Sequence, residues 1–420
     1  MRIAVIGAGL LGVTTAWFLA ESGHEVVVID REEGPGLESS FANGGMLTPS
    51  QAAPWNTPGI LWQILKWIGR EDSPFLLKPS QLFALAGWGT AFLCNSQADR
   101  FRLNQQKNIR LGLYSLSVLR KTRQQLQIQY DQSTVGTMKI YRTLRAMEES
   151  VNLLRDYRSE QVKFQILDGD GVVGLEPALS AVRKNLAGGI FFPDDESGDA
   201  RQFCHELALA GSKRGVRFMY KTSVMRLVRS ANRIKAVQTS SGNIEADTYI
   251  LAAGSDSPIL ARSVGLHLPI YPVKGYSLTM ETANQALLPV LPIIDELRHV
   301  AITPLGNRLR ISGKAELAGY DMSVDESRIQ LLLKFLNEIY PDLKGSMATA
   351  AVQKWACLRP YSSDGVPIMG PCQIDNLFLN TGHGHLGWTL AAGSARLIAD
   401  LITGGKPDLD IGPYLLSRFH

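Results

Sequence analysis

The sequence predicts an α/β protein in which a Rossmann-like, parallel-stranded domain is joined to a second, α+β domain. Two observations lead to this prediction. Residues 1–30 have the pattern of a strand, a glycine-rich turn, a helix and a second strand. The chain also has 420 residues, which is more than one hydrophobic core usually organises. Apolar residues make up 45% of the chain and charged residues 20%, so we expect folded domains rather than disorder.

The first strand and the turn after it have the spacing of a dinucleotide-binding motif. Residues 2–6 form a short apolar run that is typical of a buried parallel strand. In the turn, Gly7 allows a sharp bend, Gly9 has no side chain to hold a pyrophosphate away, and Gly12 lets a helix pack closely on the strand. The helix that begins here would point its free N–H groups at the phosphates. The predicted contacts in this turn are Gly7, Gly9, Leu10, Leu11 and Gly12.

The helix and the second strand complete the motif. We expect the helix to run through Ala20 and to stop at Gly23, and residues 25–29 to form the next strand. Asp30 ends that strand, 18 residues after Gly12, where a carboxylate commonly bonds ribose hydroxyls. The motif predicts a dinucleotide, but by itself it does not distinguish FAD from NAD.

The composition argues against several other classes of protein. The net charge is only +4 and the 43 basic residues are spread along the chain, which argues against nucleic-acid binding. The apolar N-terminus contains the glycine turn and leads into another strand, so we expect neither a cleaved signal peptide nor a transmembrane helix. No metal site is expected, because no C-x-x-C pair occurs among Cys94, Cys204, Cys357 and Cys372.

Further motifs follow the glycine turn at intervals to the C-terminus. They are 38–46 (Glu-Ser-Ser-Phe-Ala-Asn-Gly-Gly-Met), 52–55, 58–59, 66–67, 192–199, 271–277, 358–360 with 364–367, and 380–389 (Asn-Thr-Gly-His-Gly-His-Leu-Gly-Trp-Thr). In this order they resemble the FAD-dependent D-amino acid dehydrogenases of the small-subunit type, within the glycine oxidase and D-amino acid oxidase class. The resemblance covers nearly the whole chain, and it implies FAD as the cofactor.

The resemblance also implies how the chain is divided and which residues contact FAD. We expect a discontinuous FAD-binding domain built from 1–50, 196–265 and 356–420, and a substrate domain built from 51–195 and 266–355. Besides the glycine turn, the expected cofactor contacts are Asp30, Arg31, Ser39, Ser40, Asn43, Gly44, Gly45, Met46, Gly254, Gly384, Leu386, Gly387, Trp388 and Thr389.

The C-terminal motif has a physical interpretation of its own. Small and polar residues lead into an alanine-rich amphipathic helix that we expect over Ala391 to Ile402. Such an entry exposes backbone N–H groups at the positive end of the helix. Placed beside the pyrimidine ring of a flavin, these groups would stabilise the negative charge of the reduced form.

The catalytic candidates come from the chemistry of amino acid oxidation. A substrate carboxylate calls for a planar, permanently charged guanidinium, and Arg359 stands where the related oxidases bind the carboxylate. Tyr276 is expected to add a hydroxyl or to line the pocket, with Tyr271 and Tyr361 as weaker candidates. Of His383 and His385, one either contacts the substrate or bonds the backbone, and His385 is our candidate. No obligatory general base is expected.

Two features near these candidates stay open. Cys357 aligns with a cysteine that attaches FAD covalently in some sarcosine oxidase relatives, although a buried free thiol is the expected state here. The segment 59–95 is rich in aromatic and aliphatic residues, which fits either a cover over the substrate domain or contact with a membrane interface.

The function implied is oxidative deamination of D-amino acids, broadly those with small and apolar side chains, to 2-oxo acids and ammonia. A hydride passes to flavin N5, and the electrons pass to a quinone or another respiratory-chain acceptor. The expected location is the cytoplasm, peripherally on the inner membrane. The alternatives are an oxidase that uses O₂, or the FAD subunit of a hydroxyproline or sarcosine dehydrogenase complex. An NAD-linked dehydrogenase is disfavoured, because it has no need of the C-terminal flavin motif.

Overall fold

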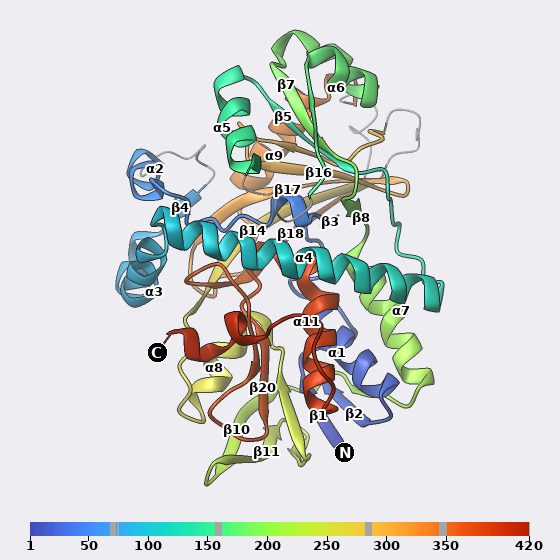
Figure 1. The fold of residues 1–420 in the computed structure, drawn as a ribbon, viewed down its shortest axis with the longest axis vertical. Coiled ribbons are helices and arrows are strands. Elements are labelled where there is room, and N and C mark those ends of the chain that lie inside the picture. The colour runs from blue at the N-terminus through green and yellow to red at the C-terminus, as the bar shows by residue number, and fades with distance from the viewer. Residues whose placement is uncertain (68–72, 74, 156–161, 282–287, 344–350, 420) are drawn as a thin grey trace.

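Two sheets organise the molecule, and a long helix runs across the region where they meet (Figure 1). The computed structural model describes residues 1–67, 73, 75–155, 162–281, 288–343 and 351–419. The lower half in Figure 1 contains a mainly parallel six-stranded sheet, and the upper half contains a larger mixed sheet.

The six-stranded sheet has the doubly wound arrangement expected from the glycine turn. Its strand order is β19-β20-β13-β1-β2-β9, and only β19 is antiparallel to its neighbour. Because β1 lies between β2 and β13, its carboxyl end opens onto the centre of the sheet edge, where α/β proteins bind ligands. The elements of this half are β1 (Arg2–Ile6), α1 (Leu10–Glu21), β2 (Glu25–Ile29), α7 (Ala200–Lys213), β9 (Arg217–Met219), β13 (Thr248–Leu251), α8 (Ser257–Arg262), β19 (Ile368–Pro371), β20 (Leu377–Thr381) and α11 (Gly387–Ile402).

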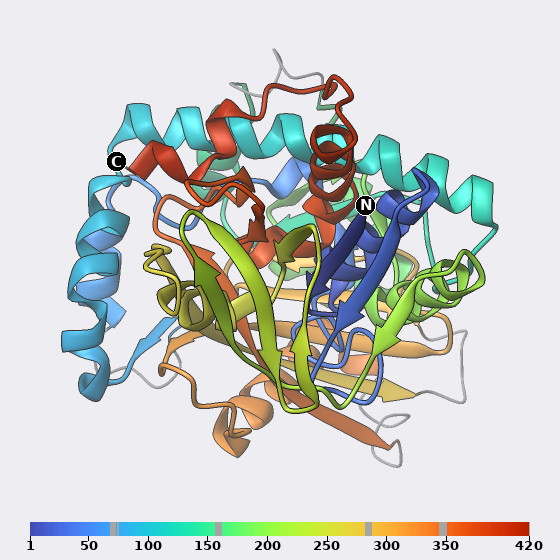
Figure 2. The same cartoon turned by 90° about the horizontal axis from the view of Figure 1, so that it is seen from below.

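A small antiparallel sheet closes the far end of this half. It consists of β10 (Val224–Ser230), β11 (Arg233–Thr239) and β12 (Gly242–Ile244), in that order. Viewed from below, its yellow-green strands lie at the end of the molecule that faces away from the large sheet (Figure 2).

The large sheet has the strand order β18-β14-β17-β16-β15-β5-β7-β6, with β4 paired to β17. Helix α9 packs against β14 and β17, and the aliphatic side chains between them form a separate core. The elements are β4 (Phe75–Leu77), β5 (Thr137–Tyr141), α5 (Leu144–Arg155), β6 (Gln165–Leu167), α6 (Gly169–Leu175), β7 (Gly188–Phe192), β14 (Ile270–Glu281), β15 (Ile293–Asp295), β16 (Val300–Leu305), β17 (Arg308–Leu317), α9 (Glu326–Ile339) and β18 (Val352–Ser362).

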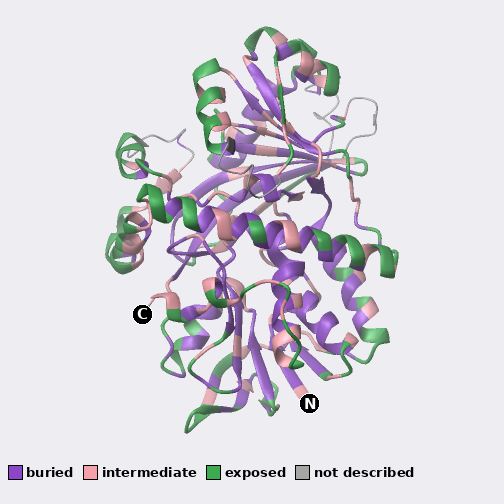
Figure 3. Cartoon of the chain, in the orientation of Figure 1, coloured by how far each residue is buried: buried purple, intermediate pink, exposed green. Residues whose placement is uncertain are grey.

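Three helices come from the segment that joins the two halves. Helix α4 (Ala98–Leu126) crosses the molecule and packs against α11, while α2 (Ile60–Trp67) and α3 (Leu82–Cys94) lie at one side of the large sheet (Figure 1). Figure 3 shows that the outer faces of α2 and α3 are largely exposed, whereas α1 and the strands of both sheets are buried. A two-residue ladder between β3 (Met46–Leu47) and β8 (Glu196–Ser197) joins the N-terminal half of the chain to the start of α7.

The expected division of the chain into domains stays a prediction, but the sheets place two segments differently. Residues 356–362 were assigned to the FAD-binding part, yet they lie in β18, which pairs along its length with β14 of the large sheet. Helix α4 was assigned to the substrate part, yet it packs on α11 beside the parallel sheet. The paired strands are about 80 residues apart and the paired helices more than 250, and local sequence patterns do not specify such pairings.

Helix α11 also begins earlier than expected, at Gly387 rather than Ala391. The reason is that Trp388 is buried, with its ring edge-on to those of Tyr130 and Phe203, and this packing holds the residues before the alanine-rich stretch in the helix. The glycine-rich sequence before the alanine-rich stretch gives no sign of this packing.

Candidate active site

One cavity of about 1280 Å³ runs between the two sheets. It extends from the carboxyl ends of β1 and β2, past the turn before α1 and the N-terminus of α11, to the face of the large sheet and the inner side of α2. All the predicted cofactor contacts except Gly12 line it, as do Arg359, Tyr276 and His385, whereas the weaker candidates Tyr271 and Tyr361 do not. Drug-sized ligands usually occupy pockets of roughly 300 to 1,000 Å³, so this cavity has room for a dinucleotide and a small substrate together.

The glycine turn is held open by backbone hydrogen bonds. Gly7 has a φ of +108° and donates its N–H to Ile29 O at 2.8 Å, which fixes the bend. A Cβ on Gly12 would lie 1.8 Å from the carbonyl oxygen of Gly7, so Gly12 does not line the cavity but lets α1 approach β1. Asp30 closes the turn from the other side, because its carboxylate accepts the Ala8 N–H at 2.5 Å and the Glu32 N–H at 2.8 Å. Asp30 thus holds the turn as well as lining the cavity.

The N-terminus of α1 faces the cavity without a side-chain cap of its own. Its N-cap residue is Gly9, and the first helical N–H, of Leu10, is donated to the Ser40 hydroxyl at 3.1 Å. The N–H groups and the positive end of a helix dipole that remain at such a terminus attract phosphate.

The segment 38–46 is fixed against both halves of the molecule. At its start, Arg31 is ion-paired with Glu38 and with Asp256 at 2.6 Å, so the guanidinium bridges the segments that follow β2 and β13 rather than standing free. At its end, Asn43 Oδ1 accepts the Gly45 N–H at 3.0 Å.

The same segment is anchored to two strands of the large sheet, β16 and β18. Thr303 Oγ1 donates to Gly44 O at 2.7 Å. The hydroxyls of Ser39 and Ser255 both donate to the carbonyl oxygen of Leu358, at 2.7 and 3.0 Å. These bonds therefore fix the part of the cavity wall formed by Gly44, Gly45 and Met46 relative to Arg359, which neighbours Leu358.

A second helix N-terminus, that of α11, faces the cavity from the other side. Its N-cap residue, Leu386, makes no side-chain cap bond. Thr389 Oγ1 accepts the Thr48 N–H at 3.0 Å, and the buried indole N–H of Trp388 has no partner among the described residues. Gly254, with a φ of +53°, lines the cavity with no protein atom within 4 Å of where its Cβ would be.

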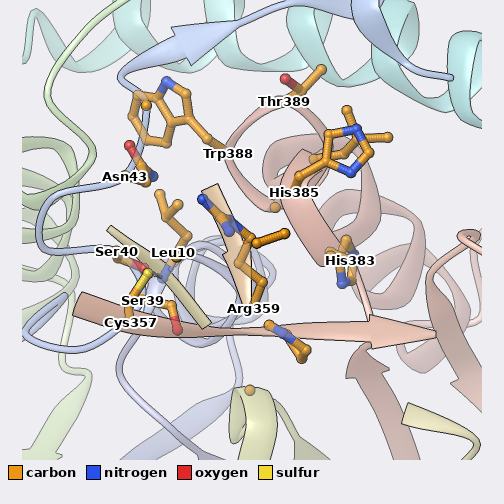
Figure 4. Close-up of a pocket in the computed structure, with 18 of the residues that line it drawn as sticks. Leu10, Ser39, Ser40, Asn43, Cys357, Arg359, His383, His385, Trp388 and Thr389 are labelled. Atoms are coloured by element: carbon orange, nitrogen blue, oxygen red, sulfur yellow. Dashed lines mark hydrogen bonds between the residues drawn. The ribbon is translucent and has the colours of Figure 1, made fainter. Parts of the chain in front are cut away.

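Arg359 lies at the centre of the labelled residues in Figure 4, with Leu10, Ser39, Ser40 and Cys357 on one side and the two histidines on the other. It projects from β18, and its guanidinium covers Gly275 of the neighbouring strand, where a Cβ would lie 2.1 Å from Nη1. Nη1 donates to Lys314 O at 3.0 Å, and no acidic side chain is paired with Arg359 among the described residues. Burial lowers its pKa, but a guanidinium still stays protonated in a protein. A half-buried cation that faces a cavity without its own anion is a site for an anionic group.

An aromatic stack covers the same end of the cavity. His385 lies parallel to Trp55 with ring centroids 4.8 Å apart and to Tyr361 at 5.9 Å, and the Arg359 guanidinium lies 5.5 Å from the Trp55 ring. Burial and the nearby Arg359 charge lower the pKa of His385 to about 3, so its ring is neutral. His383 is bonded to Ser394 Oγ at 2.9 Å, and burial lowers its pKa to about 3 as well.

Trp55 is a cavity residue to which sequence reasoning gave no role, and Tyr361 was only a weak candidate. The signal for Tyr361 is its spacing: Cys357, Arg359 and Tyr361 alternate along β18, so they share one face. Trp55 is held next to Tyr361, because its backbone N–H is donated to the Tyr361 hydroxyl at 2.7 Å.

The prediction that places the Tyr276 hydroxyl near the substrate carboxylate is not supported by its position. Val273 is the residue of β14 that pairs with Arg359, and Tyr276 comes three residues later, so its side chain points to the opposite face of the sheet. There it packs among the core under α9, and its hydroxyl donates to buried Glu316 at 2.6 Å. Part of Tyr276 borders the cavity, but its hydroxyl is engaged elsewhere.

Cys357 lies in the cavity wall opposite Gly275. Burial raises the pKa of its thiol, which keeps it in the protonated and less nucleophilic form. This environment favours a free thiol, as expected, over a covalent bond to a cofactor.

These features fit FAD. Two uncapped helix N-termini suit a pyrophosphate and the anionic pyrimidine ring, and the unpartnered buried N–H of Trp388 lines the same wall. The chain belongs to the FAD dependent oxidoreductase family, whose model matches residues 2–401. The protein is therefore an FAD-dependent enzyme, and the expected cofactor is confirmed.

Within that family, proteins named D-amino acid dehydrogenase are similar to the whole chain. The one from Paramagnetospirillum magneticum is 42% identical over 420 residues, which cover 100% of this chain and 99% of the relative. The one from Granulibacter bethesdensis is 41% identical over 419 residues, which cover 100% of both. Among solved structures, glycine oxidase from Geobacillus kaustophilus superimposes with a TM-score of 0.77 at 22% identity, covering 99% of each chain. The resemblance and the fold class predicted from the sequence are confirmed.

No helix within the described residues is long and apolar enough to cross a lipid bilayer. The same part of the chain contains no group of three or more His, Cys, Asp and Glu side chains that could hold a metal ion.

Proposed function

We propose that the protein oxidises D-amino acids to 2-oxo acids and ammonia, with Arg359 as the group that binds the substrate carboxylate. The observation that carries this proposal is a half-buried guanidinium that has no acidic partner among the described residues and faces the cavity between two helix N-termini. The preference for D-amino acids is taken from the names of the relatives that match the whole chain.

Arg359 is already oriented before a substrate binds. The bond to Lys314 O and the contact with Trp55 fix the plane of the guanidinium, which leaves its other N–H groups to form two parallel bonds to a carboxylate. The chemistry supplied by bound FAD is the acceptance of a hydride at N5. The imino acid that leaves the cavity then hydrolyses in water.

The described part of the chain offers no ionisable base beside Arg359. His383 and His385 are neutral at any working pH because their pKa values lie near 3, and burial removes the basicity that would let them hold a proton. The substrate is therefore oxidised as the free amine, and the rate should fall in acid with protonation of that amine.

The first experiment mixes the oxidised holoenzyme with D-alanine and with L-alanine in the absence of oxygen. We expect the flavin absorbance to bleach with the D-enantiomer and not with the L-enantiomer. Equal bleaching by both, or by neither, would contradict the proposal. Peroxide released during turnover in air would assign the protein to the oxidases instead.

A variant pair tests the role of Arg359. Arg359→Met removes the charge, and we expect the dissociation constant for D-alanine to rise by about 100-fold, since hydrogen bonds to a charged group are each worth about 1.5 to 3 kcal/mol. Arg359→Lys keeps the charge but loses the fork, so a rise of about 10-fold is expected. If both variants bound substrate as the wild type does, another residue would hold the carboxylate.

The electron acceptor that we propose is a quinone, reached from a membrane surface to which α2 and α3 attach. Ile60 and Ile64 of α2 line the cavity, while Trp62 on its other side is 70% exposed. On α3, Leu82 and Phe83 are also exposed, the latter to 97%. Aromatic side chains of this kind, on short helices at a surface, suit a membrane interface. The residues between the two helices, 68–72 and 74, lie outside the described part of the chain.

Vesicle sedimentation tests the attachment. The double variant Trp62→Ser, Phe83→Ser should bind vesicles of anionic phospholipid about 10-fold more weakly than the wild type, because each aromatic ring contributes apolar area to the interface. Ile166→Ser on β6, which removes an exposed apolar side chain elsewhere, is the control and should not change binding. Unchanged sedimentation of the double variant would rule out this surface.

A further inference from the structure

A row of four side chains crosses the cavity face of the large sheet. Ser312, Ala301, Ile294 and Lys139 lie opposite one another on β17, β16, β15 and β5, and all four line the cavity. The adjacent row, Ile311, Ile302, Ile293 and Met138, is buried in the core on the other face. The first row therefore forms a floor of the cavity.

The row begins beside Arg359. The guanidinium covers Gly275 on β14 and is bonded to the carbonyl oxygen of Lys314, which stands two residues from Ser312 on β17. From above, Gly44 of the 38–46 segment comes so close that a Cβ on it would lie 3.2 Å from Ser312 Oγ. Ser312 is therefore close both to the proposed carboxylate site at Arg359 and to Gly44, one of the predicted flavin contacts.

The spacing of strands gives a length scale along this floor. Neighbouring strands are about 4.8 Å apart, so Ala301 lies about 5 Å beyond Ser312, Ile294 about 10 Å and Lys139 about 14 Å. The side chain of an amino acid whose carboxylate is bound at Arg359 can reach Ala301. Even an extended lysine side chain cannot span three strand spacings to Lys139, which is ion-paired with Glu296 at 2.6 Å.

We propose that Ser312 and Ala301 form the subsite for the substrate's side chain, and that Ala301 sets the length accepted. This inference rests on the proposed function. Within reach, the floor offers one hydroxyl and one methyl group, and no charge. The subsite therefore takes short and medium apolar side chains, and the Lys139–Glu296 pair lies beyond it, near the cavity wall that α5 forms.

Straight-chain carboxylates of increasing length test the subsite in the holoenzyme without turnover. The dissociation constants of acetate, propionate, butyrate and hexanoate are measured from the perturbation of the flavin absorbance. In Ala301→Leu, we expect hexanoate to bind about 10-fold more weakly and acetate to be unchanged within about 2-fold, because only the longer chain meets the added carbons. Ala301→Gly should leave acetate unchanged and should not weaken hexanoate.

Ala146→Leu on α5 is the matched control, since it adds the same side chain to the cavity wall beyond the reach of these ligands. It should not change the ratio of hexanoate to acetate affinity. Effects of Ala301→Leu that are equal for all chain lengths, or absent for all, would overturn the subsite. A wild-type holoenzyme that binds none of the carboxylates would overturn the proposed function itself, and the subsite with it.

Discussion

Asp195 lies in the segment after β7, where its carboxyl group is buried outside the cavity and is bonded to two hydroxyls. Its Oδ2 accepts from Ser50 Oγ at 2.5 Å and from Thr137 Oγ1 at 2.7 Å. Burial raises its pKa to about 7, because the charged form loses its hydration and gains no cation. A carboxyl whose pKa is raised in the folded state stabilises the fold only while it is protonated.

The expected consequence is a loss of stability from this group as the pH rises from about 4 towards 7 and above. Asp195→Asn removes the titration while keeping an oxygen that can accept both hydroxyls. Its melting temperature, compared with that of the wild type, should therefore rise between pH 5 and pH 8.5. Thermal melts of both proteins across this range measure the difference, and a pH-independent difference would show that Asp195 does not titrate there.

The role of a residue could be predicted from the sequence where only a few residue types can perform the required chemistry. Arg359 was predicted because a carboxylate needs a guanidinium, and the structure places it in the cavity. Tyr276 borders the cavity, which was one of its two predicted roles, but the direction of its hydroxyl could not be predicted. The choice between two faces of a strand depends on register, and a bulge between Lys274 and Tyr276 lies at this point of β14. Trp55 was missed because it lies outside any regular element.

At the scale of an element, the turn before α1 distinguishes two glycines with different roles. A Cβ on Gly9 would meet only Ser40 Oγ, at an ordinary 3.4 Å, and would otherwise enter the cavity. A Cβ on Gly12 would collide with the Gly7 carbonyl inside the protein. Gly9 should therefore matter to the cofactor, and Gly12 to folding.

We expect Gly9→Val to fold but to bind FAD about 100-fold more weakly, because its side chain occupies the place of the pyrophosphate. Gly12→Val should instead fail to give soluble protein. Fluorescence quenching of added FAD and the melting temperature of the FAD-free protein separate the two effects. A Gly9→Val protein with normal FAD affinity would contradict the placement of the pyrophosphate.

Elements made by local patterns were predicted well, and those made by distant pairing were not. The strand, turn and helix of residues 2–21 follow from glycine spacing and apolar runs, and β1, α1 and β2 appear where expected. The pairing of β18 with β14, about 80 residues earlier, could not be predicted, because nothing within 352–362 specifies that partner.

At the scale of the whole molecule, the two halves are joined by a buried ionic cluster. Arg310 of β17 is 1% exposed and bonds Asp199 Oδ2 at 3.1 Å, Asn43 O at 3.2 Å and Thr279 Oγ1 at 2.9 Å. Asp199 also caps α7 and pairs with Arg308 at 3.0 Å. The cluster thus connects the large sheet to the 38–46 segment and to a helix of the other half.

Breaking this cluster should weaken the whole protein. Removing one partner of a buried pair commonly costs about 3 to 5 kcal/mol, so Arg310→Met should lower the melting temperature by several degrees. Arg145→Met, which removes an exposed pair with Glu149 on α5, is the control and should leave it unchanged. Equal melting temperatures for the wild type and Arg310→Met would mean that the cluster does not hold the halves together.

The strand order of the parallel sheet also bears on how the protein is made. Its central strand, β1, leaves the ribosome first, whereas β20 and α11, which complete the sheet and cover α1, come from the last fifth of the chain. Translation proceeds at about 5 to 20 residues per second, so the newborn N-terminus waits roughly 20 to 80 seconds for these partners. During that interval the apolar faces of β1 and α1 have no final cover, and a chaperone that shields nascent chains would act there. Capture of the flavin is then a post-translational event.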